Sequence, residues 1–220
     1  MGATDGLREA LQELAQRAGV PMEDRWLQAF ATHWDLLVQW NRTHNLTRIT
    51  GPREAAARHY LDCLVPLLTL GTPPEFVDVG SGAGFPGIVA SVLWPEARAV
   101  LVEPARKRAS FLSIAGRACG LSRVEVREPR SAAELRSARV LSRATFSGGN
   151  RGELLQYVKP PGEILAWSTP HELGTWQEEV GTWRGRGAAA TLRAEPYRIP
   201  TLEERMLVTI HVASLEERGR

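Results

Sequence analysis

The feature that most restricts the fold of this chain is a glycine-rich turn directly after a short apolar run. Residues 76–87 read Phe-Val-Asp-Val-Gly-Ser-Gly-Ala-Gly-Phe-Pro-Gly, with glycines at positions 80, 82, 84 and 87. Glycine adopts backbone conformations that side chains exclude, and it lets a backbone approach a ligand closely. In doubly wound α/β sheets, such a turn follows the first strand and binds a nucleotide-like cofactor. The segment therefore predicts a strand, a cofactor loop and a helix.

The rest of the chain fits a sheet of this kind. Residues 1–72 carry apolar side chains at helical spacing, which predicts a helical extension packed on the sheet. From residue 73 onward, short apolar runs alternate with helical stretches, as in parallel sheets with crossover helices. The predicted strands cover residues 76–79, 99–103, 124–127, 138–142, 163–167, 191–199 and 206–213. The last two are joined by a short link, which favours an antiparallel hairpin. We predict a Rossmann-like α/β domain over residues 73–220.

Composition excludes several other classes of protein. The 220 residues contain only two cysteines, which excludes a disulfide scaffold and a cysteine-rich zinc module. No apolar run approaches the roughly 18 residues that span a bilayer, so we expect no membrane and a cytoplasmic location. Net charge is +2, but residues 103–143 hold ten basic side chains against four acidic ones. This basic band suits RNA, and it equally suits a solvated arginine-rich helix face.

The turn favours one cofactor over another. In the register that starts at Gly80, the sixth position is Phe85, so the third glycine of a dinucleotide-binding turn is missing. Asp78 disfavours a pyrophosphate and favours a cationic group. S-adenosylmethionine carries an amino group and a sulfonium and no phosphate, so it fits better. Glu103 ends the second predicted strand, where an acid binds a ribose diol, and it would serve a nicotinamide cofactor equally well.

Ordered motifs along residues 7–213 resemble those of the small-subunit ribosomal RNA guanine-N7 methyltransferases, also called glucose-inhibited division protein B. The motifs are Trp-Asn-Arg-Thr-His-Asn-Leu-Thr at 40–47, His-Tyr-Leu-Asp-Cys-Leu at 59–64, the turn at 79–87, Glu-Pro-Ala-Arg-Lys-Arg-Ala-Ser-Phe-Leu at 103–112, Gly-Leu-Ser at 120–122 and Ser-Arg-Ala at 142–144. The resemblance implies a seven-stranded S-adenosylmethionine-dependent methyltransferase fold with an antiparallel last strand. It also implies methyl transfer to N7 of a guanosine in 16S ribosomal RNA.

The resemblance implies a role for individual residues as well. Gly80, Gly82 and Phe85 would contact the methionine part of the cofactor, with Asp78 beside them, and Glu103 would bind the ribose. Backbone amides of Ser131 and Ala132 would bind the adenine. Arg143 would lie where cofactor and substrate meet, as the one catalytic candidate. The candidates for substrate binding are Asn45, His59, Asp62, Arg106, Lys107 and Arg108. We expect the small ribosomal subunit or its RNA as partner, and a monomer.

The chemistry accounts for how few acid–base groups the sequence offers. Guanine N7 carries a lone pair and no proton, so it needs no general base, and its enzyme mainly holds the reactants in geometry. The five histidines and two cysteines are scattered, so we predict no metal site.

Three departures from the family pattern leave alternatives open. Residues 166–169 replace a Lys-Gly pair, residues 203–206 read Glu-Glu-Arg-Met in place of Gly-Glu-Arg-His, and Ala132 replaces an acid. A cofactor-binding RNA-associated protein with lost or altered activity is the main alternative. A nicotinamide-dependent oxidoreductase is the other.

Overall fold

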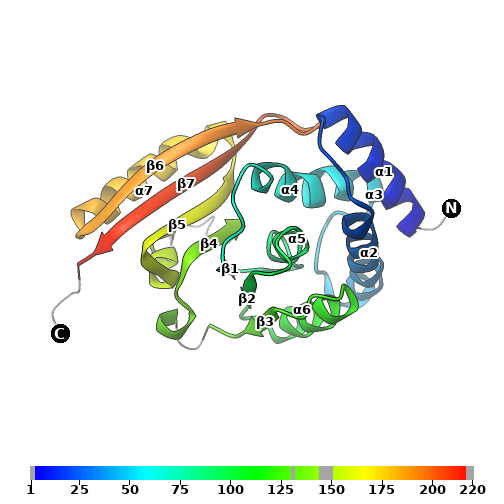
Figure 1. Cartoon of the computed structure of the whole chain (residues 1–220), viewed down its shortest axis with the longest axis horizontal. Helices are drawn as coiled ribbons and strands as arrows, with labels where there is room; N and C mark the ends of the chain where they lie inside the picture. Colours follow the sequence, from blue (N-terminus) through cyan, green and yellow to red (C-terminus); the bar gives the residue numbers. More distant parts are fainter. Residues whose placement is uncertain (1–2, 130–131, 144–150, 217–220) are drawn as a thin grey trace.

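A seven-stranded sheet forms the centre of the protein in the computed structural model, which describes residues 3–129, 132–143 and 151–216. The strands are β1 (Glu75–Val79), β2 (Arg98–Val102), β3 (Val124–Arg127), β4 (Ser137–Arg143), β5 (Val158–Ser168), β6 (Ala188–Tyr197) and β7 (Arg205–Leu215). Their order across the sheet is β3-β2-β1-β4-β5-β7-β6 (Figure 1). Strands β1 to β5 are parallel, and β7 is antiparallel to both β5 and β6. The predicted mostly parallel fold with its terminal hairpin is confirmed.

Helices precede and connect these strands. They are α1 (Ala3–Ala18), α2 (Asp24–His44), α3 (Pro52–Ala55), η1 (Ala56–Leu61), α4 (Asp62–Leu67), α5 (Gly87–Leu93), α6 (Arg106–Ala118), η2 (Ala132–Leu135), η3 (Arg151–Tyr157), η4 (Pro170–Glu172) and α7 (Leu173–Gly185). The apolar spacing of residues 60–68 predicts one α-helix that opens near Pro52, but in the structure η1, a π-helical turn, interrupts it. Such turns often occur at functional sites, and this one carries His59 directly before α4.

The region before β5 also differs from the prediction. The sequence predicts a helix over residues 152–158, whereas the structure has η3, a 3-10 helix that ends where β5 begins. Strand β5 therefore starts five residues earlier than expected, at Val158. Its pairing with β4 shifts register between Ser137 and Arg139, next to the two consecutive prolines of β5. Proline lacks the N–H that a regular ladder needs, so periodicity alone does not reveal this part of the strand.

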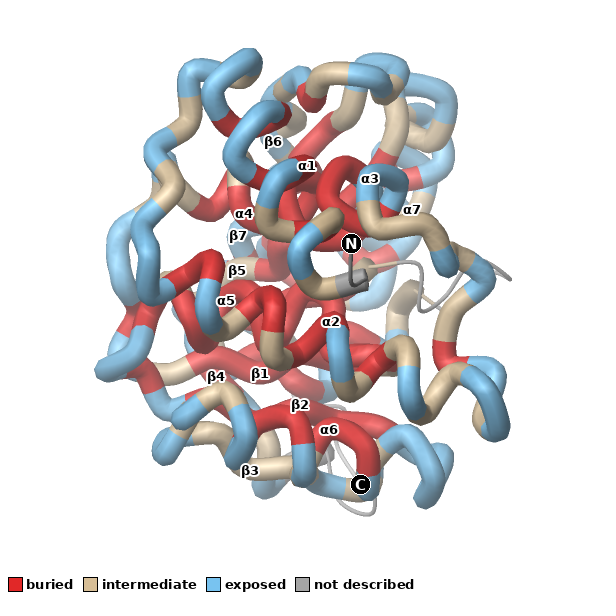
Figure 2. The backbone as a smooth tube through the Cα atoms, turned by 90° about the vertical axis from the view of Figure 1, so that its right-hand side faces the viewer, coloured by how far each residue is buried: buried red, intermediate tan, exposed pale blue. Residues whose placement is uncertain are grey.

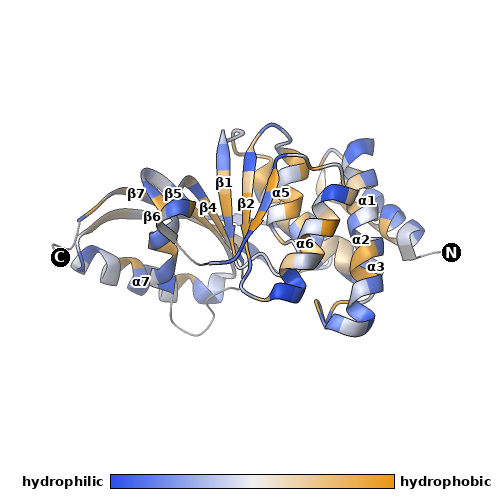
Figure 3. Cartoon of the chain, turned by 90° about the horizontal axis from the view of Figure 1, so that it is seen from below, coloured by the Kyte–Doolittle hydropathy of each residue, from blue (hydrophilic) through white to orange (hydrophobic). Residues whose placement is uncertain are grey.

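Each face of the sheet has its own core. Alternate residues of a strand point to opposite faces, so Phe76 and Leu101 pack under α1, α2, α5 and α6, whereas Val77 and Val100 pack with Trp183 of α7. Figure 3 shows α7 below β6 and β7, well apart from α5 and α6. The buried stretches in Figure 2 gather in β1, β2 and α5. Leucines of α1 belong to the same core as Phe76, so the helical region packs on the sheet, while the proposed boundary at residue 72 stays a prediction.

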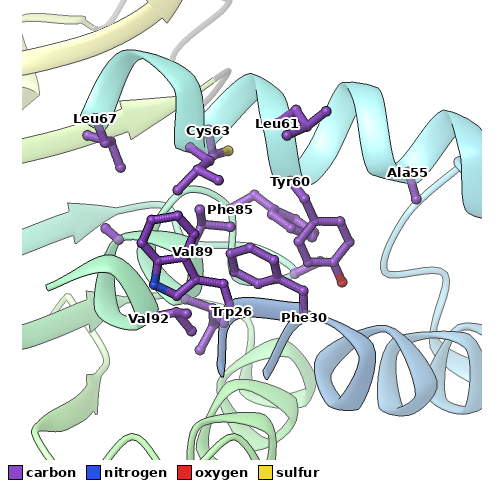
Figure 4. Close-up of a cluster of buried hydrophobic side chains, with 14 of the residues drawn as sticks. Trp26, Phe30, Ala55, Tyr60, Leu61, Cys63, Leu67, Phe85, Val89 and Val92 are labelled. Atoms are coloured by element: carbon purple, nitrogen blue, oxygen red, sulfur yellow. The ribbon is translucent and has the colours of Figure 1, made fainter. Parts of the chain in front are cut away.

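An aromatic cluster joins the helical region to the glycine turn. Trp26 and Phe30 of α2, Tyr60 of η1 and Phe85 of the turn meet beneath α4 (Figure 4). The rings of Phe30 and Tyr60 have centroids 5.1 Å apart, and Tyr60 meets the edge of Phe85 at the same distance. Within the described part of the chain, no helix has the length and hydropathy needed to cross a membrane.

Candidate active site

The glycine turn after β1 folds back onto the end of β2. The N–H groups of Gly80 and Ser81 both donate to the carbonyl of Val102, at 2.9 and 3.1 Å. Gly80, Gly82 and Gly84 have φ values of +73°, +55° and +97°, a region that residues with a Cβ rarely adopt. The turn is therefore a fixed backbone cradle at the carboxyl edge of the sheet, as the sequence predicts.

Glu103 joins the turn to the end of β2. Its carboxylate accepts hydrogen bonds from the N–H of Gly82 and of Ala105, each at 2.9 Å. The residue is only 2% exposed. An ionised carboxylate has about four acceptor positions, and these two bonds use half of them. Glu103 thus retains the capacity to accept hydrogen bonds from two hydroxyl groups.

Asp78 lies behind the turn and is completely buried. One carboxyl oxygen accepts the N–H of Gly87 at 2.9 Å, and the other has no partner among the described residues. Burial raises the pKa of Asp78 to about 7. A Cβ on Gly87 would lie 2.5 Å from the bonded oxygen and 2.4 Å from Leu101, so this contact requires glycine. The structure thus places Asp78 against the start of α5, and its predicted contact with the cofactor stays a prediction.

His33 supports the turn from α2, a role that the sequence does not reveal. Its Nε2 lies 2.9 Å from the carbonyl of Ala83, and its Nδ1 lies 2.8 Å from the hydroxyl of Tyr60. A carbonyl only accepts, so Nε2 carries the proton and Nδ1 accepts from Tyr60. Complete burial lowers the pKa of His33 to about 4. A neutral histidine therefore ties α2 to the cofactor turn.

Asp62, at the start of α4, has hydrogen-bond partners from four strands. Arg143 of β4 donates to its Oδ2 at 3.3 Å. Its Oδ1 accepts from the hydroxyl of Tyr197 at 2.8 Å and from Nε of Arg205 at 2.9 Å. The indole of Trp167 in β5 donates to its backbone carbonyl at 2.8 Å. These residues form the Asp62 cluster, in which two guanidinium groups share one buried carboxylate.

His59 connects the Asp62 cluster to the glycine turn. Its ring stacks on Phe85 with centroids 4.4 Å apart and an interplanar angle of 14°. Arg143 donates to its Nδ1 at 3.2 Å, so the neutral ring carries its proton on Nε2 and donates to Thr47 at 2.9 Å. Burial, helped by the charge of Arg143, lowers the pKa of His59 to about 3. His59 is therefore a structural wall and no proton acceptor near neutral pH.

A cavity of about 720 Å³ opens between these groups. It brings together six of the predicted site residues: Gly80, Gly82, Phe85, His59, Asp62 and Arg143. The prediction missed Thr47, which follows the α2 helix, and residues 201–205 between β6 and β7. Arg205 belongs to the Glu-Arg pair that the sequence shares with the family pattern, and this pair is a signal that could have identified it.

The other predicted residues lie elsewhere. Asn45 is exposed and ends α2 in the left-handed conformation, next to Leu46 and Thr47 of the cavity wall. The exposed side chains of residues 106–108 begin α6. Ser131 lies outside the described residues, and Ala132 begins η2. The roles of these residues stay predictions. No group of three metal-binding side chains occurs in the described ranges.

Comparison with protein families shows which family this chain belongs to. The family model for rRNA small subunit methyltransferase G (GidB) matches residues 26–191. This chain belongs to that family. It is 42% identical over 123 residues to ribosomal RNA small subunit methyltransferase G of Solibacter usitatus, covering 56% of this chain and 58% of that relative. It is 34% identical over 165 residues to the Wolinella succinogenes protein of the same name, covering 74% and 85%.

Solved structures agree on the fold. A methyltransferase from Pyrococcus furiosus superposes with a TM-score of 0.57 at 12% identity, over 84% of this chain and 98% of that one. A precorrin-6y C5,15-methyltransferase from Geobacter metallireducens superposes with a TM-score of 0.50 at 19% identity, over 74% and 90%. The GidB-family chain therefore has the Rossmann-like methyltransferase fold that the resemblance implies.

Proposed function

We propose that this GidB-family protein transfers a methyl group from S-adenosylmethionine to N7 of a guanosine in 16S ribosomal RNA. One observation carries the proposal: a single cavity joins the glycine turn, held to Glu103, with the arginine-containing Asp62 cluster. The first end suits a phosphate-free nucleoside cofactor. The second end carries Arg143 and Arg205, and arginine is a side chain that contacts nucleic acids.

The residues at the first end fit this cofactor. Glu103 has unused acceptor capacity for a ribose diol, and the turn between Gly80 and Gly82 leaves its backbone open to a methionine chain. Phe85 also lines the cavity, where His59 stacks on its ring and the Arg143 guanidinium lies over it at 5.3 Å. The cofactor, when bound, supplies an activated methyl group. The chain itself supplies orientation and the exclusion of water.

The site also fits a nucleophile that needs no deprotonation. Of the ionisable groups in the cavity wall, His59 has a pKa of about 3, and its Nδ1 lone pair is engaged by Arg143. Arg143, Tyr197 and Arg205 together donate four hydrogen bonds to the Asp62 carboxylate. His59 and Asp62 are therefore engaged in structural contacts, which suits attack by a lone pair that needs no base, such as that of guanine N7.

The proposal also includes the RNA contacts, the cellular location and the oligomeric state of the protein. The exposed basic residues 106–108 at the start of α6 are the proposed phosphate contacts. We propose the small ribosomal subunit or its 16S RNA as substrate, in the cytoplasm, with the protein acting as a monomer.

Methyl transfer from tritiated S-adenosylmethionine to small subunits from cells that lack this protein tests the proposal. We expect saturable labelling by the native protein, and less than 1% of it from Gly82→Trp, because the indole would fill the turn. Arg143→Ala should lower labelling at least a hundredfold while cofactor binding persists. Arg193→Ala, a control on the exposed side of β6, should match the native protein. Cofactor binding without transfer to any RNA would favour the non-catalytic alternative, and binding of NADH the oxidoreductase.

A further inference from the structure

The segment that connects β6 and β7 lines the cavity on the side farthest from the glycine turn, counted across the sheet. Strand β7 is antiparallel, so its first residue, Arg205, lies at the edge where the parallel strands end. Two strands, β4 and β5, separate β7 from β1. Neighbouring strands lie about 4.8 Å apart, so three strand spacings separate β1 from β7 by about 14 Å. Residues 201–205 therefore face the part of the cavity beyond the cofactor end.

This connection is held firmly. Ile199 is 2% exposed and belongs to the core beneath the helices, and Leu202 donates its N–H to the carbonyl of Ile199 at 3.0 Å. On either side, Tyr197 and Arg205 are bound to Asp62. Thr201 has φ of +77°, an unusual value for a β-branched residue. Strained backbone of this kind persists where surrounding structure enforces it, often at functional sites.

The connection places two acidic residues in the cavity wall, Glu203 and Glu204. Glu204 forms an ion pair with Arg198 at 3.6 Å. Glu203 is exposed and makes no hydrogen bond or ion pair with the residues that the structure describes, so its carboxylate is accessible to a molecule bound in the cavity. A free carboxylate repels RNA phosphates, so a favourable contact of Glu203 with RNA has to involve hydrogen-bond donors of a base.

Guanine offers such a contact. Its Watson–Crick edge presents two adjacent donors, N1–H and the exocyclic N2 amino group, which a carboxylate accepts with its two oxygens. Adenine presents an acceptor at N1, which a carboxylate repels. We propose that Glu203 is a specificity-determining residue that binds the N1–H and N2 amino groups of the target guanine, leaving N7 on the opposite edge for the methyl group. This inference rests on the proposed function and names the residue that selects its base.

Nucleotides that differ at one group test this contact. Binding of guanosine, inosine and adenosine 5′-monophosphates is measured by NMR titration of the full chain with S-adenosylhomocysteine present. Inosine lacks the N2 amino group, and all three share the phosphate. We expect the native protein to prefer the guanosine nucleotide over the inosine nucleotide by about tenfold or more, the range of a bidentate base contact. In Glu203→Gln, one oxygen becomes a donor that opposes the N2 amino group, so the preference should fall to about one.

Glu195→Gln, on the exposed part of β6, is the matched control and should keep the native preference. Unchanged thermal denaturation shows that each variant is folded. An equal preference in the native protein and Glu203→Gln overturns the inference, as does a rise in methyl transfer to small subunits in Glu203→Gln, because removal of mere repulsion would produce that rise. If the native protein transfers no methyl group to RNA, the proposed function fails first, so the two failures are distinguishable.

Discussion

The two ends of the cavity are built from different parts of the chain. At the glycine turn, backbone groups make most of the contacts: Gly80 and Ser81 bind Val102, and Gly82 binds Glu103. At the far end, side chains make them: Asp62 holds Arg143, Tyr197 and Arg205. A backbone cradle tolerates few substitutions, since only residues able to adopt its φ values fit. A side-chain cluster keeps its architecture while neighbouring residues vary.

Two of the three departures from the family pattern lie toward the far end, at residues 166–169 and 203–206. Thr169, Glu203 and Glu204 all lie in the cavity wall. The third departure, Ala132, concerns the predicted adenine contact, so variation also enters at the cofactor end, outside the retained glycine turn.

The largest effect is expected from Asp62→Ala. Without the carboxylate, Arg143 and Arg205 would keep two charges in a poorly solvated cluster, since the three side chains are 4%, 16% and 22% exposed. Removal of one partner from such a cluster should lower the free energy of unfolding by about 4 kcal/mol. Urea denaturation measures this. The exposed pair between Arg193 and Glu195 is the control, and Glu195→Ala should cost about 0.5 kcal/mol or less. Equal costs for both variants would show that the cluster is not a structural centre.

The pH dependence of stability tests the cofactor end of the cavity through the buried Asp78. The folded pKa of Asp78 is about 7, above its ordinary value of 3.8. The neutral acid is therefore favoured in the folded state, and its contribution to stability is full below pH 3.8 and is lost as the pH rises through 7. Asp78→Asn removes this titration. Between pH 4 and 8 the variant should gain stability relative to the native protein, by at most about 4 kcal/mol. If the native protein and Asp78→Asn give parallel curves of unfolding free energy against pH, the raised pKa of Asp78 is contradicted.

Gly87→Ala tests the close contact behind the turn. The added methyl group would lie 2.4 Å from Leu101 and 2.5 Å from Asp78. We expect a loss of about 2–3 kcal/mol, measured by thermal denaturation, together with weaker cofactor binding. Gly181→Ala is the matched control, because Gly181 lies on the exposed side of α7 with nothing within 4 Å. That substitution should raise stability by about 0.5–1 kcal/mol.

The smallest effect on stability is expected from replacing Arg106, Lys107 and Arg108 together with alanine. All three are exposed, and the Arg106 pair with Glu128 is long, at 3.9 Å. Unfolding should change by less than about 1 kcal/mol. RNA binding should weaken, and the slope of log affinity against log salt should fall by about 2, for three lost phosphate contacts to a single strand. An unchanged slope would place the RNA elsewhere.

Sequence reasoning succeeds where one short segment determines the geometry. The glycines after residue 79 predict the cofactor turn, and strand periodicity predicts the sheet, because both depend on neighbouring residues. The same reasoning predicts that Glu103 follows the second strand, and the structure places it against Gly82.

It fails where geometry depends on contacts distant in sequence. Nothing around His33 indicates that it binds Ala83, 50 residues later. Helical spacing places Asp62 on the same face as His59, which suits a wall of the site or a local pair, but it does not reveal that the partners of Asp62 include Arg205, 143 residues away. The π-helical turn before Asp62 is equally invisible, because the apolar spacing of residues 60–68 fits a regular α-helix.

The long span of the Asp62 cluster affects how the protein is made. Asp62 leaves the ribosome 143 residues before Arg205, an interval of about 7 to 30 seconds at translation rates of about 5–20 residues per second. Throughout that time the carboxylate of the helical region lacks Arg205, the last of its partners to be made. A nascent chain that ends before residue 201 lacks residues 201–205 of the cavity wall, so the proposed activity is expected to require the complete C-terminal hairpin.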